Sequence, residues 1–180
     1  MKITALWERL DVPGYDAALV EDIPGGWTLR GTTVFRHESA PASLTYAVQC
    51  DSKWICRSGE IRGWIGAREY ELVVKHDSDG TWFLNDYPVP GLQDCVDLDF
   101  GFTPATNFTH LRRLNLEIGQ SVTFPVRGSM YRGPRSRCCL SIMNGATKSR
   151  TGTTRQPRRM PNDSLSPGLG SWRIIQVSGV

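Results

Sequence analysis

Apolar and polar residues alternate along most of the first 120 positions, with the period of two that is typical of half-buried β-strands. The clearest run is 96–103, where four large apolar residues alternate with polar or small ones. Several runs end at recognisable turns, for example at Asp77–Gly80, where Gly suits the backbone of a hairpin loop. The segments that we predict to be strands are 2–10, 27–35, 43–49, 70–75, 81–84, 96–103 and 114–118.

Helical periodicity is weak throughout the chain. The segments 16–20 and 104–111 are the only candidates, and neither has a persuasive apolar stripe. Strands at short spacing with few helices favour a mainly β fold with antiparallel connections. A length of 180 residues is most simply one domain, and the first 120 residues alone are long enough to bury a core.

The character of the chain changes near residue 121. Residues 1–120 have 11 Lys and Arg against 17 Asp and Glu, a net charge of −6. Residues 121–180 have 10 against one, a net charge of +9, and they are rich in Arg, Ser, Gly and Pro with little apolar pattern. We therefore expect an ordered domain over 1–124 and a basic, largely irregular tail over 125–180.

Targeting signals and membrane spans are not expected. The first residues have no apolar signal region, and no long apolar run occurs. The five cysteines are scattered without CxxC spacing, which suits a reducing compartment, so we expect a cytoplasmic protein.

Asp97 and Asp99 are the most interesting candidates for chemistry, because two carboxylates two positions apart share one face of a strand. Such a pair could hold a metal or serve in acid–base catalysis, but it is more often a solvated or hydrogen-bonded face. The three histidines have no metal-ligand spacing, and no nucleophile or phosphate-binding motif occurs. We therefore predict no catalytic set, no metal site and no cofactor.

Arg112 and Arg113 could bind an anionic headgroup or phosphate bidentately. On a strand the two would face opposite ways, so only one could reach a given cavity. The alternative is that one of them pairs with Asp97 or Asp99 across the sheet, and this alternative is favoured.

Three stretches of the chain, 44–64, 79–107 and 111–119, carry a family resemblance. They read LTYAVQCDSKWICRSGEIRGW, DGTWFLNDYPVPGLQDCVDLDFGFTPATN and LRRLNLEIG. The Cys-x-Asp-x-Asp element before Thr-Pro-x-Thr-Asn and Arg-Arg-Leu resembles the putative glycolipid-binding family, formerly a domain of unknown function. The resemblance covers about residues 3–120. It implies a spiral β-roll, a long curled antiparallel sheet around a single helix, similar to periplasmic lipoprotein carriers and usually dimeric.

The resemblance also implies a ligand and a set of residues for it. A curled sheet with an apolar concave face could shelter acyl chains while polar residues at its rim bind sugar or phosphate. The residues matched by motif are Tyr46, Arg57, Asp97, Asp99, Thr103, Thr106, Asn107, Arg112 and Arg113. The chain departs from the family pattern at Cys56, where a small polar residue is expected, and at Phe108–His110, which replaces a more apolar link with Pro.

Two hypotheses account for the tail. One is that it is a divergent basic extension. The favoured one is a shift of reading frame, because the family pattern of alternating strands stops at about Phe124. In the shifted frame Met130–Tyr131 must encode Val, and 126–139 can be read as AWFDVPGAALEVL. Early stop codons in the alternative frame of the gene would contradict this hypothesis.

Three functions follow, in order of preference. The first is a non-catalytic module that binds a glycolipid or another amphiphile. The second is a tether for nucleic acid or an anionic membrane through the basic tail, which lacks RGG repeats and interleaved aromatics. Its residues would be Arg127, Arg132, Arg135, Arg137, Lys148, Arg150, Arg155, Arg158 and Arg159. The third is a small-molecule enzyme that uses Asp97 or Asp99.

Overall fold

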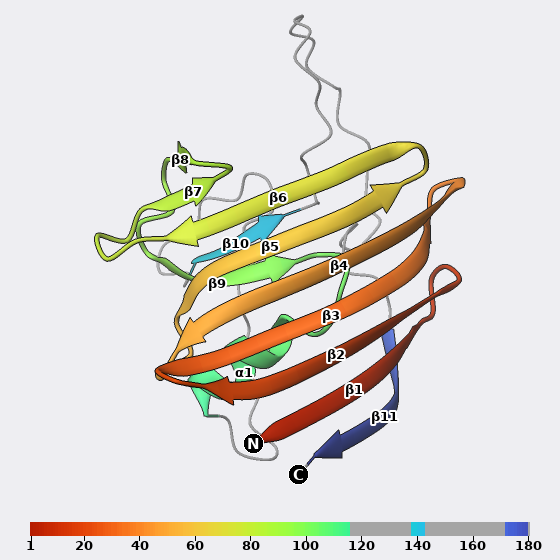
Figure 1. The fold of residues 1–180 in the computed structure, drawn as a ribbon, viewed down its shortest axis with the longest axis horizontal. Coiled ribbons are helices and arrows are strands. Elements are labelled where there is room, and N and C mark those ends of the chain that lie inside the picture. The colour runs from red at the N-terminus through yellow and green to blue at the C-terminus, as the bar shows by residue number, and fades with distance from the viewer. Residues whose placement is uncertain (116–137, 143–171, 180) are drawn as a thin grey trace, which may run out of the picture.

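One long antiparallel sheet dominates the fold (Figure 1). The computed structural model describes residues 1–115, 138–142 and 172–179. The sheet has nine strands in the order β11-β1-β2-β3-β4-β5-β6-β7-β8, so β1 to β8 form a meander in which each strand pairs with the next along the chain. These strands are β1 (Lys2–Arg9), β2 (Gly14–Ile23), β3 (Gly26–His37), β4 (Ala40–Asp51), β5 (Cys56–Ile65), β6 (Arg68–His76), β7 (Trp82–Leu84), β8 (Tyr87–Val89) and β11 (Trp172–Gly179).

Short turns fix the register of the meander. Gly25 and Gly66 have positive φ angles of 85° and 59° in the turns that follow β2 and β5, a backbone conformation that glycine adopts without steric cost. The turn at Asp77–Gly80 also forms as predicted, because the Asp77 carboxylate accepts hydrogen bonds from the backbone N–H groups of Asp79 and Thr81. The predicted mainly β architecture with antiparallel connections is confirmed.

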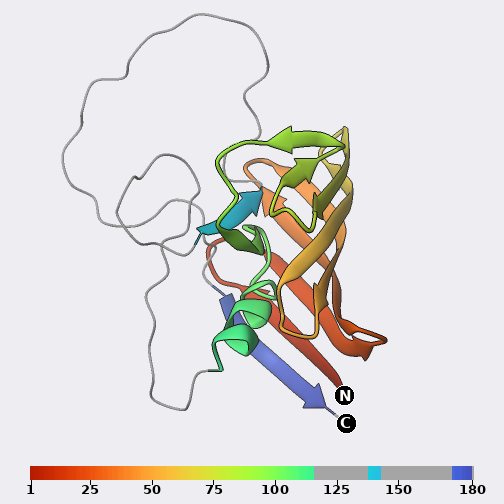
Figure 2. The ribbon, with the colours of Figure 1, turned by 90° about the vertical axis from the view of Figure 1, so that its left-hand side faces the viewer.

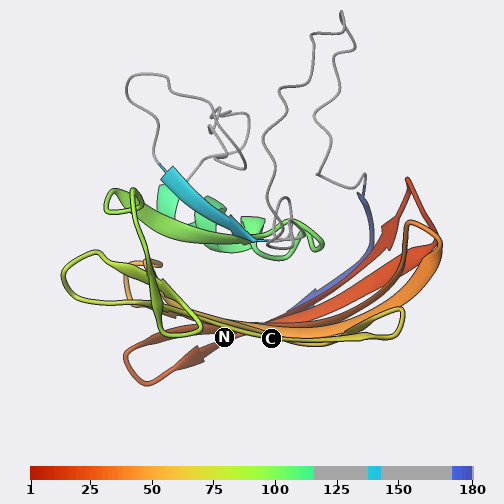
Figure 3. The same cartoon turned by 90° about the horizontal axis from the view of Figure 1, so that it is seen from above.

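A second layer covers one face of the sheet, which we call the inner face (Figures 2 and 3). It consists of β9 (Cys95–Phe100), the helix α1 (Asn107–Leu114) and β10 (Cys138–Ile142), which pairs with β9 in parallel. The sheet curls around this layer, so the inner face is concave (Figure 3). The opposite side, which faces the viewer in Figure 1, is called the outer face.

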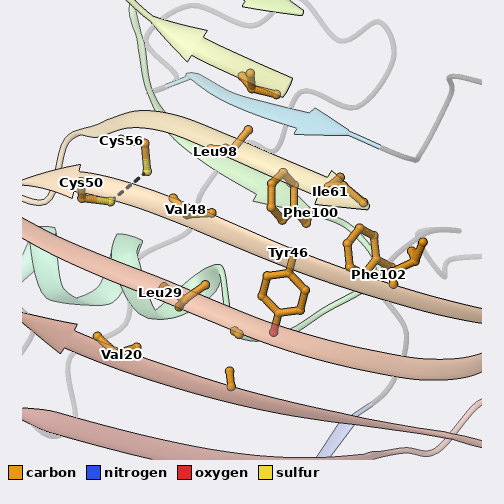
Figure 4. Close-up of a cluster of buried hydrophobic side chains, with 14 of the residues drawn as sticks. Val20, Leu29, Tyr46, Val48, Cys50, Cys56, Ile61, Leu98, Phe100 and Phe102 are labelled. Atoms are coloured by element: carbon orange, nitrogen blue, oxygen red, sulfur yellow. Dashed lines mark hydrogen bonds between the residues drawn. The ribbon is translucent and has the colours of Figure 1, made fainter. Parts of the chain in front are cut away.

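The core lies between the inner face and β9 (Figure 4). Val48 and Ile61 point inward from the sheet, and Leu98 and Phe100 point toward them from β9, all of them fully buried. Gly59 allows this close approach, because a Cβ atom there would collide with the Leu98 side chain. Tyr46 packs edge-on against Phe100 and Phe102, with ring centroids 6.0 and 5.7 Å apart, and so joins the two layers.

Two segments differ from their predicted structure. Residues 16–20, a weak helical candidate, belong to β2, where Asp16, Ala18 and Val20 alternate with more exposed neighbours. The weak pattern at 104–111 does contain a helix, and α1 extends it to Leu114 before Asn115 ends it with a left-handed backbone conformation. A strand starting at Leu114 is therefore wrong, and 116–118 lie outside the described residues.

Two strands occur within 125–180 that the sequence pattern did not predict. β10 pairs with β9, and β11 pairs with β1 at the edge of the main sheet. The other residues of this segment, with most of the basic residues of the hypothetical tether, lie outside the described part. The reading-frame hypothesis, which concerns the gene, stays a prediction.

Candidate functional site

A buried polar cluster joins the inner face to the loop after β9. The hydroxyl of Tyr46 donates a hydrogen bond of 2.7 Å to Oδ1 of Asp16 and lies 2.9 Å from Oγ1 of Thr103. Tyr46 on β4 reaches Asp16 on β2 by crossing Gly31 of β3, where a Cβ atom would collide with the phenol. All three polar residues are buried, so the cluster holds the second layer against the sheet.

The carboxyl group of Asp16 is buried in a way that disfavours its ionised form. It is fully buried, and its Oδ2 has no hydrogen-bond partner among the residues that the structure describes. Burial raises the pKa of Asp16 from 3.8 to about 6, although the hydrogen bonds from Thr103 and Tyr46 act in the opposite direction. Burial and the neighbouring Asp16 carboxylate also raise the pKa of the Tyr46 phenol.

Asp97 and Asp99 share one face of β9, as predicted, and this face is turned toward α1. Asp97 forms a bidentate ion pair with the Arg113 guanidinium, through an Nε–Oδ1 contact of 2.9 Å and a shorter Nη2–Oδ2 contact. The Oδ1 of Asp99 accepts a 2.8 Å hydrogen bond from the Thr106 hydroxyl, which precedes the helix. Both carboxylates therefore fix α1 onto β9.

The two neighbouring arginines lie on a helix and not on a strand, which corrects the geometry expected from the sequence. Arg113 does pair with Asp97, as the favoured alternative states, but from α1 and not across the sheet. Arg112 is exposed and lies over the rings of Trp54 and Phe108, at 5.7 and 5.9 Å from the centroids. It covers an aromatic cluster in which these two rings pack edge-on.

The remaining predicted residues are dispersed. Arg57 is at the surface and binds Asp51, with an Nη2–Oδ2 distance of 2.8 Å. Asn107 is exposed at the first position of α1. Cys56, a departure from the family pattern, is fully buried, with its thiol 3.9 Å from the Thr109 hydroxyl and 3.4 Å from the Cys50 thiol. The structure thus places six of the nine predicted residues between the sheet and α1, where they contact one another in three pairs. The pairs are Tyr46 with Thr103, Asp97 with Arg113, and Asp99 with Thr106.

The outer face of the sheet has a central hollow that no sequence motif predicts. Its volume is about 800 Å³. Two transverse rows of paired residues form it, one running from Leu6 through Ala17, Thr32 and Thr45 to Arg62. The second row consists of Thr4, Leu19, Arg30, Ala47 and Glu60, and Gln176 of β11 completes the wall.

The hollow exists because small side chains occupy the middle of the sheet and long ones surround them. Ala17, Thr32, Thr45 and Ala47 are short, so the surface drops between the larger neighbouring side chains. Leu6 and Leu19 add apolar area to the floor. The arrangement combines a mainly apolar floor that also contains threonine hydroxyls with charged groups around it, which is the general form of a small-molecule site.

An edge hollow of about 570 Å³ adjoins the central one and shares Arg62 with it. It lies between β5 and β6, and its other residues are Gly63, Trp64, Glu69, Tyr70 and Glu71. The side chain of Arg62 contacts Glu71 on β6, with an Nε–Oε1 distance of 3.3 Å, and Glu60 on its own strand at 3.6 Å. The two hollows are therefore neighbours, with the side chain of Arg62 at their border.

Metal-binding clusters of three or more His, Cys, Asp or Glu are absent from the part of the chain that the structure describes. Among the residues that line the central hollow, none is Ser, Cys or His, the usual nucleophiles and bases. Of its polar side chains, the arginines and Glu60 can bind through charge-assisted hydrogen bonds.

A family model described as putative glycolipid-binding matches residues 4–127. The chain belongs to the putative glycolipid-binding family. The match spans β1 to α1, and so includes β9 and α1 of the second layer and every residue of the outer-face hollows except Gln176.

A solved structure supports the fold of this family member. The crystal structure of a DUF1089 family protein from Pseudomonas aeruginosa has a TM-score of 0.50 and 23% sequence identity, over 59% of this chain and 58% of that chain. The chain thus spans little more than half of the length of that relative. The comparison with curated proteins gives no match. Within the described residues, no helix is long and apolar enough to cross a membrane.

Proposed function

We propose that the protein binds an amphiphilic, glycolipid-like molecule on the outer face of its sheet and does not transform it. One observation carries the proposal, the central hollow of about 800 Å³ with a mainly apolar floor, threonine hydroxyls within it and charged side chains around it. Apolar surface of this kind favours an alkyl chain, whereas arginine, glutamate and threonine side chains favour a hydroxylated headgroup. The name of the family agrees with this ligand class.

The interior between the sheet and the second layer is a less suitable location for the ligand. Its apolar side chains are already covered by β9 and α1, and Leu44, Leu98 and Phe100 have no exposed surface. Its carboxylates are engaged with Arg113 and Thr106. A ligand there would have to replace contacts that hold the two layers together, whereas the outer hollow is open in the folded protein.

The charges of the outer face argue against a general polyanion site. Arg30 pairs with Glu21 at 3.0 Å, and Arg62 contacts Glu60 and Glu71. Neither arginine is therefore an uncompensated positive charge of the kind that binds phosphate backbones. The homodimer that the resemblance implies stays a prediction, which light scattering of the purified chain can check.

The proposal can be tested by filling the central hollow. Ala47→Trp places a large ring over the floor, and Gln49→Trp is the matched control, because Gln49 is exposed on the same face of β4 but does not line the hollow. The probe is octyl β-glucoside below its micelle concentration, with binding measured by isothermal titration calorimetry. We expect Ala47→Trp to weaken binding at least about tenfold and Gln49→Trp to leave it nearly unchanged. Equal binding by both variants would contradict the proposal.

A further inference from the structure

The edge hollow differs from the central hollow in the side chains that it offers to a ligand. Trp64 is 41% exposed on the outer face, and none of the ring contacts found among the described residues involves it. A large aromatic ring exposed in a concave surface is the less common situation, since tryptophan is usually highly buried. Its flat apolar face, bordered by polar groups, matches the C–H face of a sugar ring, which is apolar and is surrounded by hydroxyls.

Carboxylates surround this ring. Trp64 pairs in the sheet with Glu69, and Arg62 pairs with Glu71. Both glutamates line the hollow on strand β6. Ionised carboxylates only accept hydrogen bonds, so they suit the hydroxyl donors of a sugar.

The residues that line the edge hollow have a small excess of negative charge. Glu69 and Glu71 line it together with one cation, Arg62, which also contacts Glu60 of the central hollow. An anionic headgroup would meet like charges here, which destabilises binding. An uncharged ring would avoid this repulsion and still use the carboxylates as acceptors.

We propose that the edge hollow takes an uncharged sugar ring, stacked on Trp64 and hydrogen-bonded to Glu69 and Glu71. The alkyl chain of the same molecule lies in the central hollow, which adjoins it at Arg62. The inference rests on the proposed function and adds the class of headgroup: a neutral glycoside, and not a phosphate, sulfate or uronic acid.

A pair of probes that differ in a single group tests this inference. Octyl β-glucoside and octyl β-glucuronide have the same chain and ring, but the glucuronide has a carboxylate at C6. We expect the glucoside to bind at least about tenfold more tightly at neutral pH and low salt. The double variant Glu69→Gln, Glu71→Gln should narrow this ratio, because it removes two negative charges. Equal or tighter binding of the glucuronide by the unmodified protein would overturn the inference.

The stacking contact is tested by Trp64→Leu, with Tyr15→Leu as its control. Tyr15 is 53% exposed in the same transverse row of the outer face, where the row runs from Tyr15 through Val34 and Ser43 to Trp64, but it lines neither hollow. We expect Trp64→Leu to weaken glucoside binding about tenfold and Tyr15→Leu to change it little.

The outcomes separate this inference from the proposed function. If Ala47→Trp abolishes binding while Trp64→Leu has no effect, the headgroup assignment is wrong and the outer-face site stands. If Ala47→Trp has no effect, the proposed function itself fails, and the headgroup assignment fails with it.

Discussion

The two sides of the main sheet use polar residues in different ways. On the inner side, Asp16 of β2 and Asp97 and Asp99 of β9 are buried, and each carboxylate contacts a side chain from another element. On the outer face, Arg62 and its glutamate partners are largely exposed. The residues that form the most distinctive motif in the sequence therefore assemble the fold, whereas the open surface is made of ordinary residues.

This difference has an energetic consequence. A buried charge that loses its partner retains the full cost of its desolvation, whereas an exposed charge is solvated by water instead. Substitutions in the inner layer should therefore change the free energy of unfolding, and substitutions on the outer face should change ligand binding with little effect on stability.

The largest difference is expected between Arg113→Ala and Arg62→Ala. Arg113→Ala leaves Asp97, which is 3% exposed, without its guanidinium partner, and should lower the free energy of unfolding by about 3–5 kcal/mol. The Arg62 side chain is 60% exposed, so its removal should cost less than about 1 kcal/mol. Urea denaturation of both variants measures these changes. Similar losses of stability in the two variants would mean that the inner layer is not held by this pair.

A smaller effect on the free energy of unfolding is expected from the titration of Asp16. Its pKa is raised in the folded protein, so between about pH 4 and 6 the folded state binds more protons than the unfolded state. The stabilisation from this group is complete below pH 4 and is lost as the pH rises through 6. The difference between the pKa values of 3.8 and about 6 corresponds to roughly 3 kcal/mol as an upper bound.

Asp16→Asn removes this titration and keeps an acceptor for the Tyr46 hydroxyl. The variant should gain stability relative to the unmodified protein as the pH is raised from 4 to 7, and the gain should approach a plateau above pH 6. Denaturation curves at four or five pH values measure this difference. A difference that does not vary with pH would show that Asp16 has an ordinary pKa in the folded state.

The alternation of residues predicted much of the fold, because strands with one buried face have a strict period of two. The run at 96–103 correctly placed Asp97 and Asp99 on one face of β9 and Leu98 and Phe100 on the other. The helix predicted at 16–20 is wrong: these residues belong to a strand, and the buried Asp16 accepts a hydrogen bond from the Tyr46 hydroxyl. Tyr46 lies 30 positions further along the chain, so this contact leaves no local signal.

The outer-face site could not be predicted in the same way. Each strand from β1 to β5 contributes only a few residues of common types, such as Ala17, Thr32 and Thr45. Whether they lie side by side depends on the register of the four strand pairs from β1 to β5, and no sequence motif specifies that register. The sequence also does not set Trp64 apart from the other tryptophans, because alternation alone does not distinguish a buried tryptophan from an exposed one.

The most direct test of the central claim is to map the ligand on the backbone amides by NMR during a titration with octyl β-glucoside. We expect the shifted signals to cluster on the outer-face rows, at Ala17, Thr32, Thr45, Arg62 and Trp64. Shifts concentrated instead at Asp97, Thr103, Thr106 and Asn107 would place the ligand in the second layer and contradict binding on the outer face.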